Sequence, residues 1–280
     1  MHLYAISDLH VGHAANLEAV NRLPSYPNDW LIVAGDIAES DQLMKVCFSI
    51  LTKRFAKVFW TPGNHDLWTI PTSTNKKRGV AKYEHIVELA REYGVVTPED
   101  EYVLWPDESN PALIAPIFIG YDYSFRPDDV AERDVLKWAE EEGIVAADEV
   151  FLHPDPYATR GDWCAARCQI TEKRLQSAAQ QAPLIIVNHY PLCQEHAKLP
   201  RVPRFTPWCG TRRTQRWHLR FRPLAIVHGH LHIRGQRIKD DIPFNEVSLG
   251  YPRQWKVERG VADYLRPILT MGVPSTPILS

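Results

Sequence analysis

Five short apolar runs recur along the chain, and polar residues follow each of them at once. The runs occupy residues 3–6, 31–34, 58–60, 184–187 and 224–227. They are rich in Val, Ile and aromatic residues and do not alternate with polar positions, which is typical of strands covered on both faces. We therefore expect five central strands.

Helical patterns lie between these runs, at residues 42–55, 83–93, 130–142 and about 162–181. In the last of these helices Asp162 is expected to cap the start, and Pro183 to stop the end. Residues 112–120 and 235–248 add strand patterns without intervening helices. Strands that alternate with helices, together with these extra strands, predict an α/β fold with a core of two mixed sheets.

The length of the chain favours one domain. A chain of 280 residues with 45% hydrophobic content can bury a substantial core without being divided. We expect a single domain over residues 1–280, with an insertion at about 190–222 and an extended tail at about 264–280. The tail has apolar anchors between prolines, so it is expected to lie across the body of the fold or to contact a partner.

Charge and cysteine usage narrow the function classes. The formal net charge of -2 gives no global preference for nucleic acid or an anionic membrane. Five cysteines at irregular spacings do not suggest disulfides, and Cys164 and Cys168 lack the second pair that a zinc site needs. A strand pattern that starts at Leu3, with no signal core ahead of it, and the lack of a long apolar stretch predict a cytoplasmic protein without a membrane span.

Residues of the types that can bind metals follow all five apolar runs. They are Asp8 and His10, then Asp36, then Asn64, His65 and Asp66, then His189, and finally His228, His230 and His232. In open α/β sheets the ligand crevice lies outside the carboxyl ends of the strands, so these side chains should meet. Two cations about 3.5–4 Å apart can neutralise a phosphoryl group and lower the pKa of bound water to near neutrality. The pattern therefore predicts a two-metal hydrolytic centre, in which Asp36, placed after the flexible Gly35, bridges the metals.

Together these residues resemble a known family. Asp8-x-His10, Gly35-Asp36, Gly63-Asn64-His65-Asp66, His189 and Gly229-His230-x-His232 are similar to the signature of the calcineurin-like metallophosphoesterases. The resemblance spans residues 8–232 and implies a four-layer α/β/β/α sandwich. It assigns one metal to Asp8, His10, Asp36 and His232, and the other to Asp36, Asn64, His189 and His230.

The resemblance also implies a mechanism. His65 would meet the phosphoryl or leaving-group oxygen, Asp66 would orient its imidazole, and a hydroxide that bridges the metals would attack phosphorus in line. Mixed nitrogen and oxygen ligands suit Mn or Fe, with Zn as the alternative, better than an all-oxygen Mg or Ca site. His13 and His228 lie outside the signature and are expected not to bind metal.

The insertion is rich in cations. Residues 196–222 contain no Asp or Glu, and their cations are Lys198, Arg201, Arg204, Arg212, Arg213, Arg216, Arg220 and Arg222. Because metal ligands flank the segment, it should form a positive rim over the metals. We expect a substrate cap in which Arg212, Arg213 and Arg216 bind the substrate and Trp208 and Trp217 form an apolar wall or a stacking surface. The alternative is a basic surface loop with its tryptophans packed underneath.

A narrower resemblance concerns the substrate. The stretches that carry it are residues 29–36, 121–125, 208–211, 217–218 and 247–253. They are similar to the bacterial 4'-phosphopantetheinyl hydrolases, which remove 4'-phosphopantetheine from acyl carrier proteins by cleaving the phosphodiester to serine. The resemblance implies an acyl carrier protein as partner, and carrier proteins are typically acidic, so an arginine-rich rim would attract one.

Other functions compete with this one. A Ser/Thr protein phosphatase is disfavoured because Ile37, Ala38 and Glu39 stand without the downstream Asp-Arg-Gly of those enzymes. Phosphodiesterases of cyclic nucleotides or other small diesters remain open, as does a nuclease. A non-catalytic scaffold is disfavoured because every ligand position and His65 are filled.

Overall fold

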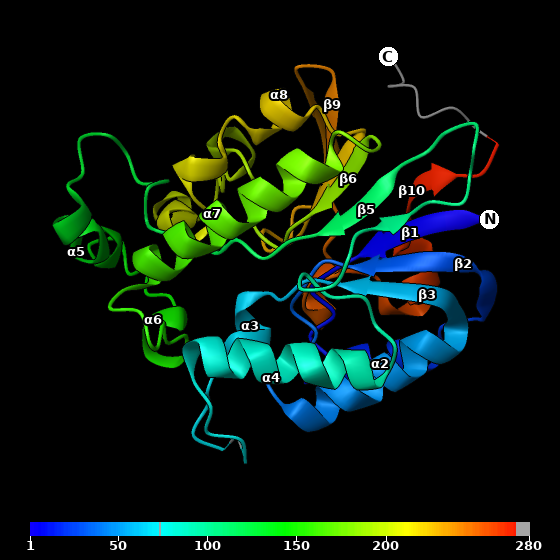
Figure 1. The fold of residues 1–280 in the computed structure, drawn as a ribbon. Coiled ribbons are helices and arrows are strands. Elements are labelled where there is room, and N and C mark those ends of the chain that lie inside the picture. The colour runs from blue at the N-terminus through cyan, green and yellow to red at the C-terminus, as the bar shows by residue number, and fades with distance from the viewer. Residues whose placement is uncertain (73, 273–280) are drawn as a thin grey trace.

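Two mixed β-sheets stack face to face, and helices cover both outer surfaces (Figure 1). The computed structural model describes residues 1–72 and 74–272. The first sheet has the order β10 (Arg266–Thr270), β1 (His2–Ile6), β2 (Tyr26–Val33) and β3 (Phe55–Trp60). The second has the order β4 (Val103–Leu104), β5 (Leu113–Pro116), β6 (Leu184–Val187), β7 (Ala225–His228), β9 (Ile242–Glu246) and β8 (Gly235–Lys239). The predicted four-layer α/β/β/α sandwich is confirmed.

The helices fall into two outer layers and a peripheral group. They are α1 (Ala14–Asn21), α2 (Asp41–Arg54), α3 (Asn64–Leu67), α4 (Gly79–Glu92), α5 (Val135–Glu140), α6 (Asp148–Phe151), α7 (Arg160–Ala178) and α8 (Trp217–Phe221). Short 3-10 turns are η1 (Glu132–Asp134), η2 (Gln194–His196), η3 (Pro203–Trp208), η4 (Arg212–Thr214), η5 (Pro252–Gln254), η6 (Val257–Arg259) and η7 (Val261–Tyr264). None of the helices in the described residues is long and apolar enough to cross a bilayer.

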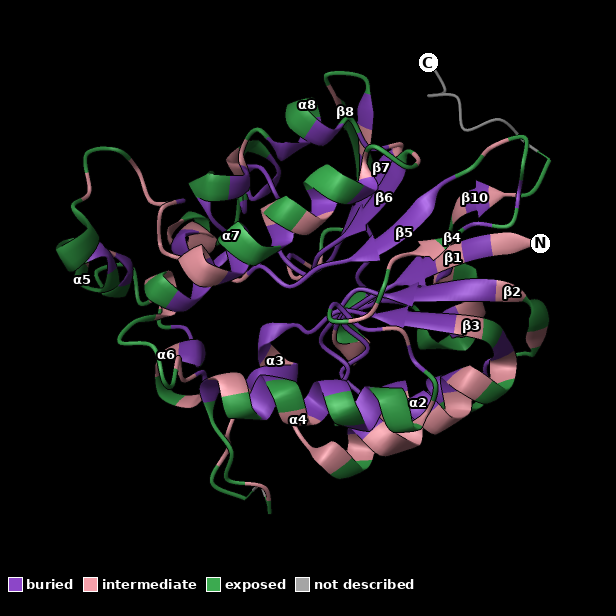
Figure 2. Ribbon diagram, viewed as in Figure 1, coloured by how far each residue is buried: buried purple, intermediate pink, exposed green. Residues whose placement is uncertain are grey.

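Both faces of the inner strands are buried, which explains their continuous hydrophobicity. In β2, Leu31 and Val33 pack towards the helices, while Trp30 and Ile32 pack between the two sheets. Figure 2 shows the strands buried and the outward faces of the helices exposed. Successive side chains of a strand point to opposite faces, so a strand between two packed layers needs apolar residues at every position.

Three details differ from the sequence predictions. The start of α7 is capped by Thr159, whose hydroxyl accepts the Asp162 N–H, while Asp162 is the third residue of the helix and its carboxylate accepts the Thr159 N–H. The run at 58–60 belongs to β3, which is an edge strand rather than a central one. Part of the tail is a strand, because β10 pairs antiparallel with β1. Residues 273–280 of the tail lie outside the described residues.

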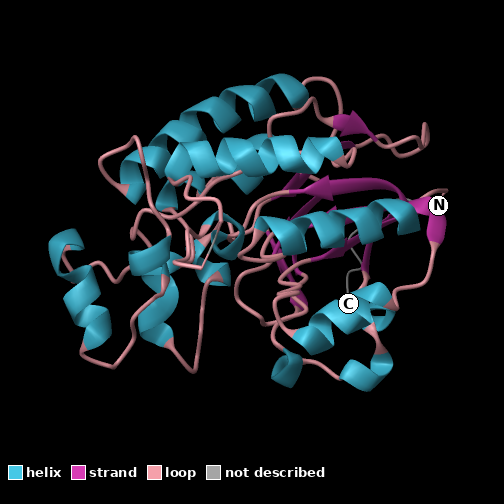
Figure 3. Ribbon diagram, turned by 90° about the horizontal axis from the view of Figure 1, so that it is seen from below, coloured by secondary structure: helices cyan, strands magenta, loops and turns pink. Residues whose placement is uncertain are grey.

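The strand order brings the loops with metal-binding residues together. Parallel pairing of β1, β2 and β3, and of β5, β6 and β7, directs their carboxyl ends to the same side of the stacked sheets. Figure 3 shows from below how the loops gather beside the strand ends, while the helices lie outside. The crevice at this edge is where an α/β sheet places its ligands.

Candidate metal centre

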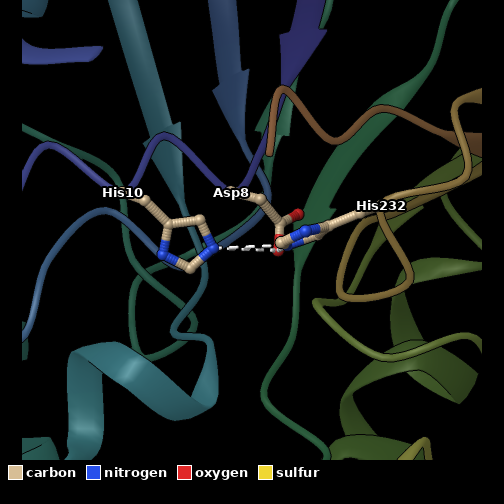
Figure 4. A group of neighbouring side chains, drawn as sticks. All are labelled: Asp8, His10 and His232. Carbon is tan, nitrogen blue, oxygen red and sulfur yellow. Dashed lines mark hydrogen bonds and ion pairs between the residues drawn. The ribbon is translucent and has the colours of Figure 1, made fainter. Parts of the chain in front are cut away.

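The side chains predicted to bind metal converge in three overlapping groups. Potential ligand atoms lie within 4.8 Å of one another in each group: Asp8, His10 and His232; His10, Asp36 and His65; and Asp36, His189 and His230. Figure 4 shows the first group, in which Asp8 and His10 leave the end of β1 and His232 comes from the loop after β7. Asp36 belongs to the second and third groups, which fits its predicted bridging role.

The backbone is strained at these residues. Five metal-ligand candidates have positive φ, namely Asp8 (53°), His10 (40°), Asp36 (56°), His230 (72°) and His232 (53°). A positive φ is uncommon for residues other than glycine, and such strain persists where the surrounding structure enforces it, often at functional sites. Gly35 has φ 89°, and a Cβ there would lie 2.6 Å from His189 Nδ1. Only glycine therefore allows this close approach.

The first group has its histidine nitrogens set for metal binding. His232 Nε2 lies 3.0 Å from Asp8 Oδ1 and 3.3 Å from His10 Nε2. On the far side of the ring, His232 Nδ1 lies 2.8 Å from Gln254 Oε1, which also accepts the Tyr251 N–H at 2.7 Å. Because the Gln254 oxygen can only accept, Nδ1 carries the proton, and Nε2 keeps its lone pair for a metal.

The third group, Asp36, His189 and His230, has the same design. His189 Nδ1 donates to the carbonyl of Ala34 at 2.8 Å, so Nε2 faces the site, 3.5 Å from Asp36 Oδ2 and 3.2 Å from His230 Nδ1. Asn64 is held beside Asp36 by its neighbour in sequence, because the N–H of His65 donates to Asp36 Oδ1 at 2.9 Å. The buried Oδ1 of Asn64 has no hydrogen-bond partner among the described residues. Ligand atoms whose lone pairs face one another, with no hydrogen-bond donor between them, suit a bound cation.

The pKa directions fit the same conclusion. Burial raises the pKa of Asp36 well above its ordinary value, and the nearby Asp8 and Asp66 carboxylates raise it further. Burial lowers the pKa of His189 to about 4 and that of His230 well below its ordinary range. The imidazoles are thus held in the neutral form that binds metals, and an anionic Asp36 needs neighbouring cations.

His65 lies at the edge of the second ligand group. Its Nε2 is 4.0 Å from Asp36 Oδ2, and its Nδ1 is 2.7 Å from Glu39 Oε1. The ring packs against Trp68, with 3.7 Å between the ring centroids. Desolvation acts to raise the pKa of Glu39, but the hydrogen bond and charge of His65, a backbone hydrogen bond and the charge of His13 together more than offset it, so the net pKa is lowered. The side chain that orients the imidazole is therefore Glu39.

The predicted orienting role of Asp66 is wrong. Its carboxylate accepts the backbone N–H groups of Asp36, Ile37, Ala38 and Gly63 at 2.8 to 3.2 Å. It also accepts the indole N–H of Trp60 at 3.4 Å. Asp66 therefore fixes the strained loop that carries Asp36. It affects the reaction only indirectly, through the position of that loop.

Replacing Glu39 with Gln is expected to lower kcat about 10- to 100-fold, the usual cost of removing an orienting side chain, with little change in KM. A Gln amide can still hydrogen-bond to Nδ1 but cannot balance the charge of a protonated imidazole. Steady-state kinetics with an aryl phosphodiester measures the loss, and metal analysis of the same sample should show unchanged content. Full kcat in the variant would remove Glu39 from the mechanism.

The predicted cap contacts the metal centre through a residue that the sequence analysis did not single out. Phe205 stacks on His230, with 5.9 Å between the ring centroids. Trp208 lies beneath Phe205, buried, with its indole N–H donated to Glu149 at 2.7 Å. Trp217 packs in the core of the second sheet against Phe221. The expectation of a stacking surface is wrong for Trp217, whose packing matches the alternative interpretation.

Carboxylates from other segments neutralise half of the cations in the cap. The ion pairs are Arg204 with Glu141 and Glu142, Arg212 with Asp128, Arg213 with Asp122, and Arg220 with Glu172. Arg216 is exposed and has no ion pair within the described part of the chain. The positive rim is therefore weaker than the cap sequence alone suggests, and Arg216 shares its lack of an ion pair in the described residues with Lys198, Arg201 and Arg222.

Three residues at the site were missed from the sequence. Glu39 follows Asp36 by three positions, which is a usable signal, because a short loop after a ligand can return to the site. Gln254 and Asp148 hold His232 and Asn64 from segments far along the chain, and no spacing links them to a motif.

Comparison with known proteins agrees with this geometry. Residues 1–234 match the family described as calcineurin-like phosphoesterase. Over 269 residues the chain is 43% identical to the acyl-carrier-protein phosphodiesterase PptH of Mycobacterium tuberculosis, a match that covers 95% of this chain and 83% of that protein. The crystal structure of phosphopantetheinyl hydrolase from Mycobacterium tuberculosis matches with a TM-score of 0.91 and 41% identity, covering 97% of this chain and 96% of the other.

Proposed function

The chain belongs to the calcineurin-like phosphoesterase family, and we propose that within it the protein removes 4'-phosphopantetheine from acyl carrier proteins. As a member, it is a metal-dependent hydrolase of phosphoric esters with a dinuclear metal centre. One observation supports the narrower substrate most strongly. The likeness to the mycobacterial enzyme covers 95% of the chain, so it extends beyond the metal ligands into most of the cap.

The site residues would have the following roles in metal binding. Asp8, His10, Asp36 and His232 would hold one metal ion, and Asp36, Asn64, His189 and His230 the other. When bound, the two ions supply a hydroxide from water near neutral pH and offset the charge of the phosphoryl group. Mn or Fe suits this mixture of imidazole, carboxylate and amide ligands, with Zn as the alternative.

His65 would complete the reaction at the leaving group. Cleavage forms a bond from a water oxygen to phosphorus and breaks the bond from phosphorus to the serine oxygen. The departing oxygen needs a proton, which His65 Nε2 would give, while Glu39 would keep Nδ1 protonated. The products are 4'-phosphopantetheine and an unmodified serine of the carrier protein.

Arg216 is the cap cation whose role is simplest to test. Replacing it with Ala is expected to raise KM for a carrier protein roughly 3- to 10-fold, because a rim charge acts mainly on encounter. The dependence of KM on salt concentration should not become steeper. The kcat for a small aryl phosphodiester should not change. Arg22→Ala, which removes an exposed cation directly after α1, is the matched control. Equal KM values for Arg216→Ala and the wild-type enzyme would contradict the role of Arg216.

A substrate panel tests the proposed function. The purified, metal-loaded enzyme is given a phosphomonoester, an aryl phosphodiester, a cyclic nucleotide and a phosphopantetheinylated carrier protein. The carrier protein is expected to show the highest kcat/KM. A higher value for the cyclic nucleotide would assign the site to small diesters. A cytoplasmic location belongs to the same proposal, and cell fractionation tests it.

A further inference from the structure

Two adjacent carboxylates on the short helix α6 serve different parts of the site. Asp148 is buried and lies against the metal centre, whereas Glu149 contacts the cap. Helix α6 lies in the segment between β5 and α7, away from the motifs that carry the metal ligands. Neither residue takes part in the hydrolysis described above.

Asp148 determines which way the amide of Asn64 points. Asn64 Nδ2 donates to Asp148 Oδ1 at 2.9 Å. A carboxylate only accepts, so the amide group must turn its nitrogen to Asp148 and its oxygen to the opposite side. The Asn64 oxygen is the atom that a metal binds, and it is buried without a partner in the described residues. The reversed amide would direct two N–H groups at a cation.

The same carboxylate oxygen also holds Trp68. The Trp68 indole N–H donates to Asp148 Oδ1 at 2.7 Å. The Trp68 ring packs on the His65 imidazole, with 3.7 Å between centroids and 30° between planes. One oxygen atom of α6 therefore has hydrogen bonds to a metal ligand and to the aromatic ring that supports the leaving-group histidine.

Glu149 faces away from these residues. It accepts the Trp208 indole N–H at 2.7 Å and the Tyr123 hydroxyl at 2.8 Å, and it forms an ion pair with Arg160 at 2.9 Å. Its partners belong to the cap, to the loop after β5 and to the start of α7. A change at Glu149 should therefore disturb the cap but not the amide of Asn64.

We propose that Asp148 is a positioning residue of the metal centre, which sets the Asn64 amide for metal binding and the Trp68 ring for His65. The inference rests on the metal ligands and not on the carrier-protein substrate. Removing a side chain that orients a metal ligand typically lowers metal affinity or activity about 10- to 100-fold, and we expect a loss of about this size here.

Three variants separate positioning from general structural support. Asp148→Leu keeps the approximate shape but has no acceptor, so the affinity of the apo-enzyme for Mn²⁺ at the site that includes Asn64 should fall about 10- to 100-fold. Asp148→Asn keeps a carbonyl oxygen that can accept both N–H groups, and its affinity should stay within about threefold. Glu149→Gln, one residue along the same helix, should bind Mn²⁺ like the wild type. Calorimetric titration with Mn²⁺ measures all three, with thermal melting to confirm folding.

A double-mutant cycle with Asn64→Ala gives the decisive result. If Asp148 acts through Asn64, then Asp148→Leu has no further effect on Mn²⁺ affinity once Asn64 is alanine. Additive losses, or equal losses in Asp148→Leu and Glu149→Gln, would overturn the proposal. If Asp148→Leu does not fold, Asp148→Ser replaces it in the cycle, because its shorter side chain also leaves both donors without an acceptor. Neither titration depends on which phosphodiester the enzyme prefers.

Discussion

Replacing Asp36 with Asn is expected to lower kcat for any phosphodiester by about 10³-fold or more, because the metals supply several kcal/mol of transition-state stabilisation. Asp36 belongs to two of the three ligand groups, and in the proposed assignment its carboxylate is shared by the two metal sets. An amide offers one neutral oxygen in place of two charged ones, so it cannot hold both cations.

Metal analysis and kinetics on one sample measure this effect. The Asp36→Asn protein should contain fewer than two metals per chain, and added Mn²⁺ should restore little activity. Chelator-treated wild-type enzyme should be equally inactive but should recover with Mn²⁺ or Fe²⁺. Asp263→Asn, an exposed carboxylate paired with Arg259, is the matched control. A kcat within about tenfold of the wild-type value would contradict the bridging role.

Replacing His65 with Ala is expected to lower kcat by about 10²- to 10⁴-fold, the usual range for a lost general acid. Metal content should not change, because His65 is not one of the residues proposed to hold the two metals. The deficit should depend on the leaving group. An alkyl alcohol such as serine needs the proton, whereas a nitrophenolate leaves without it.

Kinetics with a graded series of leaving groups checks this prediction. The ratio of wild-type to His65→Ala kcat should be largest for alkyl esters and smallest for nitrophenyl esters. A ratio that does not change across the series would show that His65 does not donate the proton. The Glu39→Gln variant should follow the same trend more weakly, since it perturbs the same imidazole.

The metal ligands could be read from the sequence because each follows a strand directly. Asp8, Asp36 and His189 stand one to three residues after an apolar run, and parallel pairing brings the strand ends together. Local spacing therefore carries the three-dimensional information at these positions. The five strands and the core of two mixed sheets followed from the same pattern, whereas the four-layer arrangement was implied by the resemblance to the metallophosphoesterases.

Contacts between distant segments could not be read in this way. Asp66 is adjacent to His65 in sequence, but α3 turns its carboxylate to the backbone of 36–38, while Glu39 in that same loop after β2 approaches the imidazole. In the cap, the tryptophan pattern could not tell burial from exposure, and Trp217 lies on the face of α8 that joins the core. The acids that neutralise Arg204 and Arg212 come from residues 128–142, which no cap motif indicates.

The substrate is tested most directly by mass spectrometry of an intact phosphopantetheinylated carrier protein incubated with the Mn²⁺-loaded enzyme. The carrier protein is expected to lose the whole 4'-phosphopantetheinyl group and return to unmodified serine, while the His65→Ala enzyme leaves it unchanged over the same time. An unmodified serine residue, rather than phosphoserine, identifies the bond that is cut. A carrier protein that keeps its prosthetic group while the same enzyme sample hydrolyses an aryl phosphodiester would contradict the proposed function.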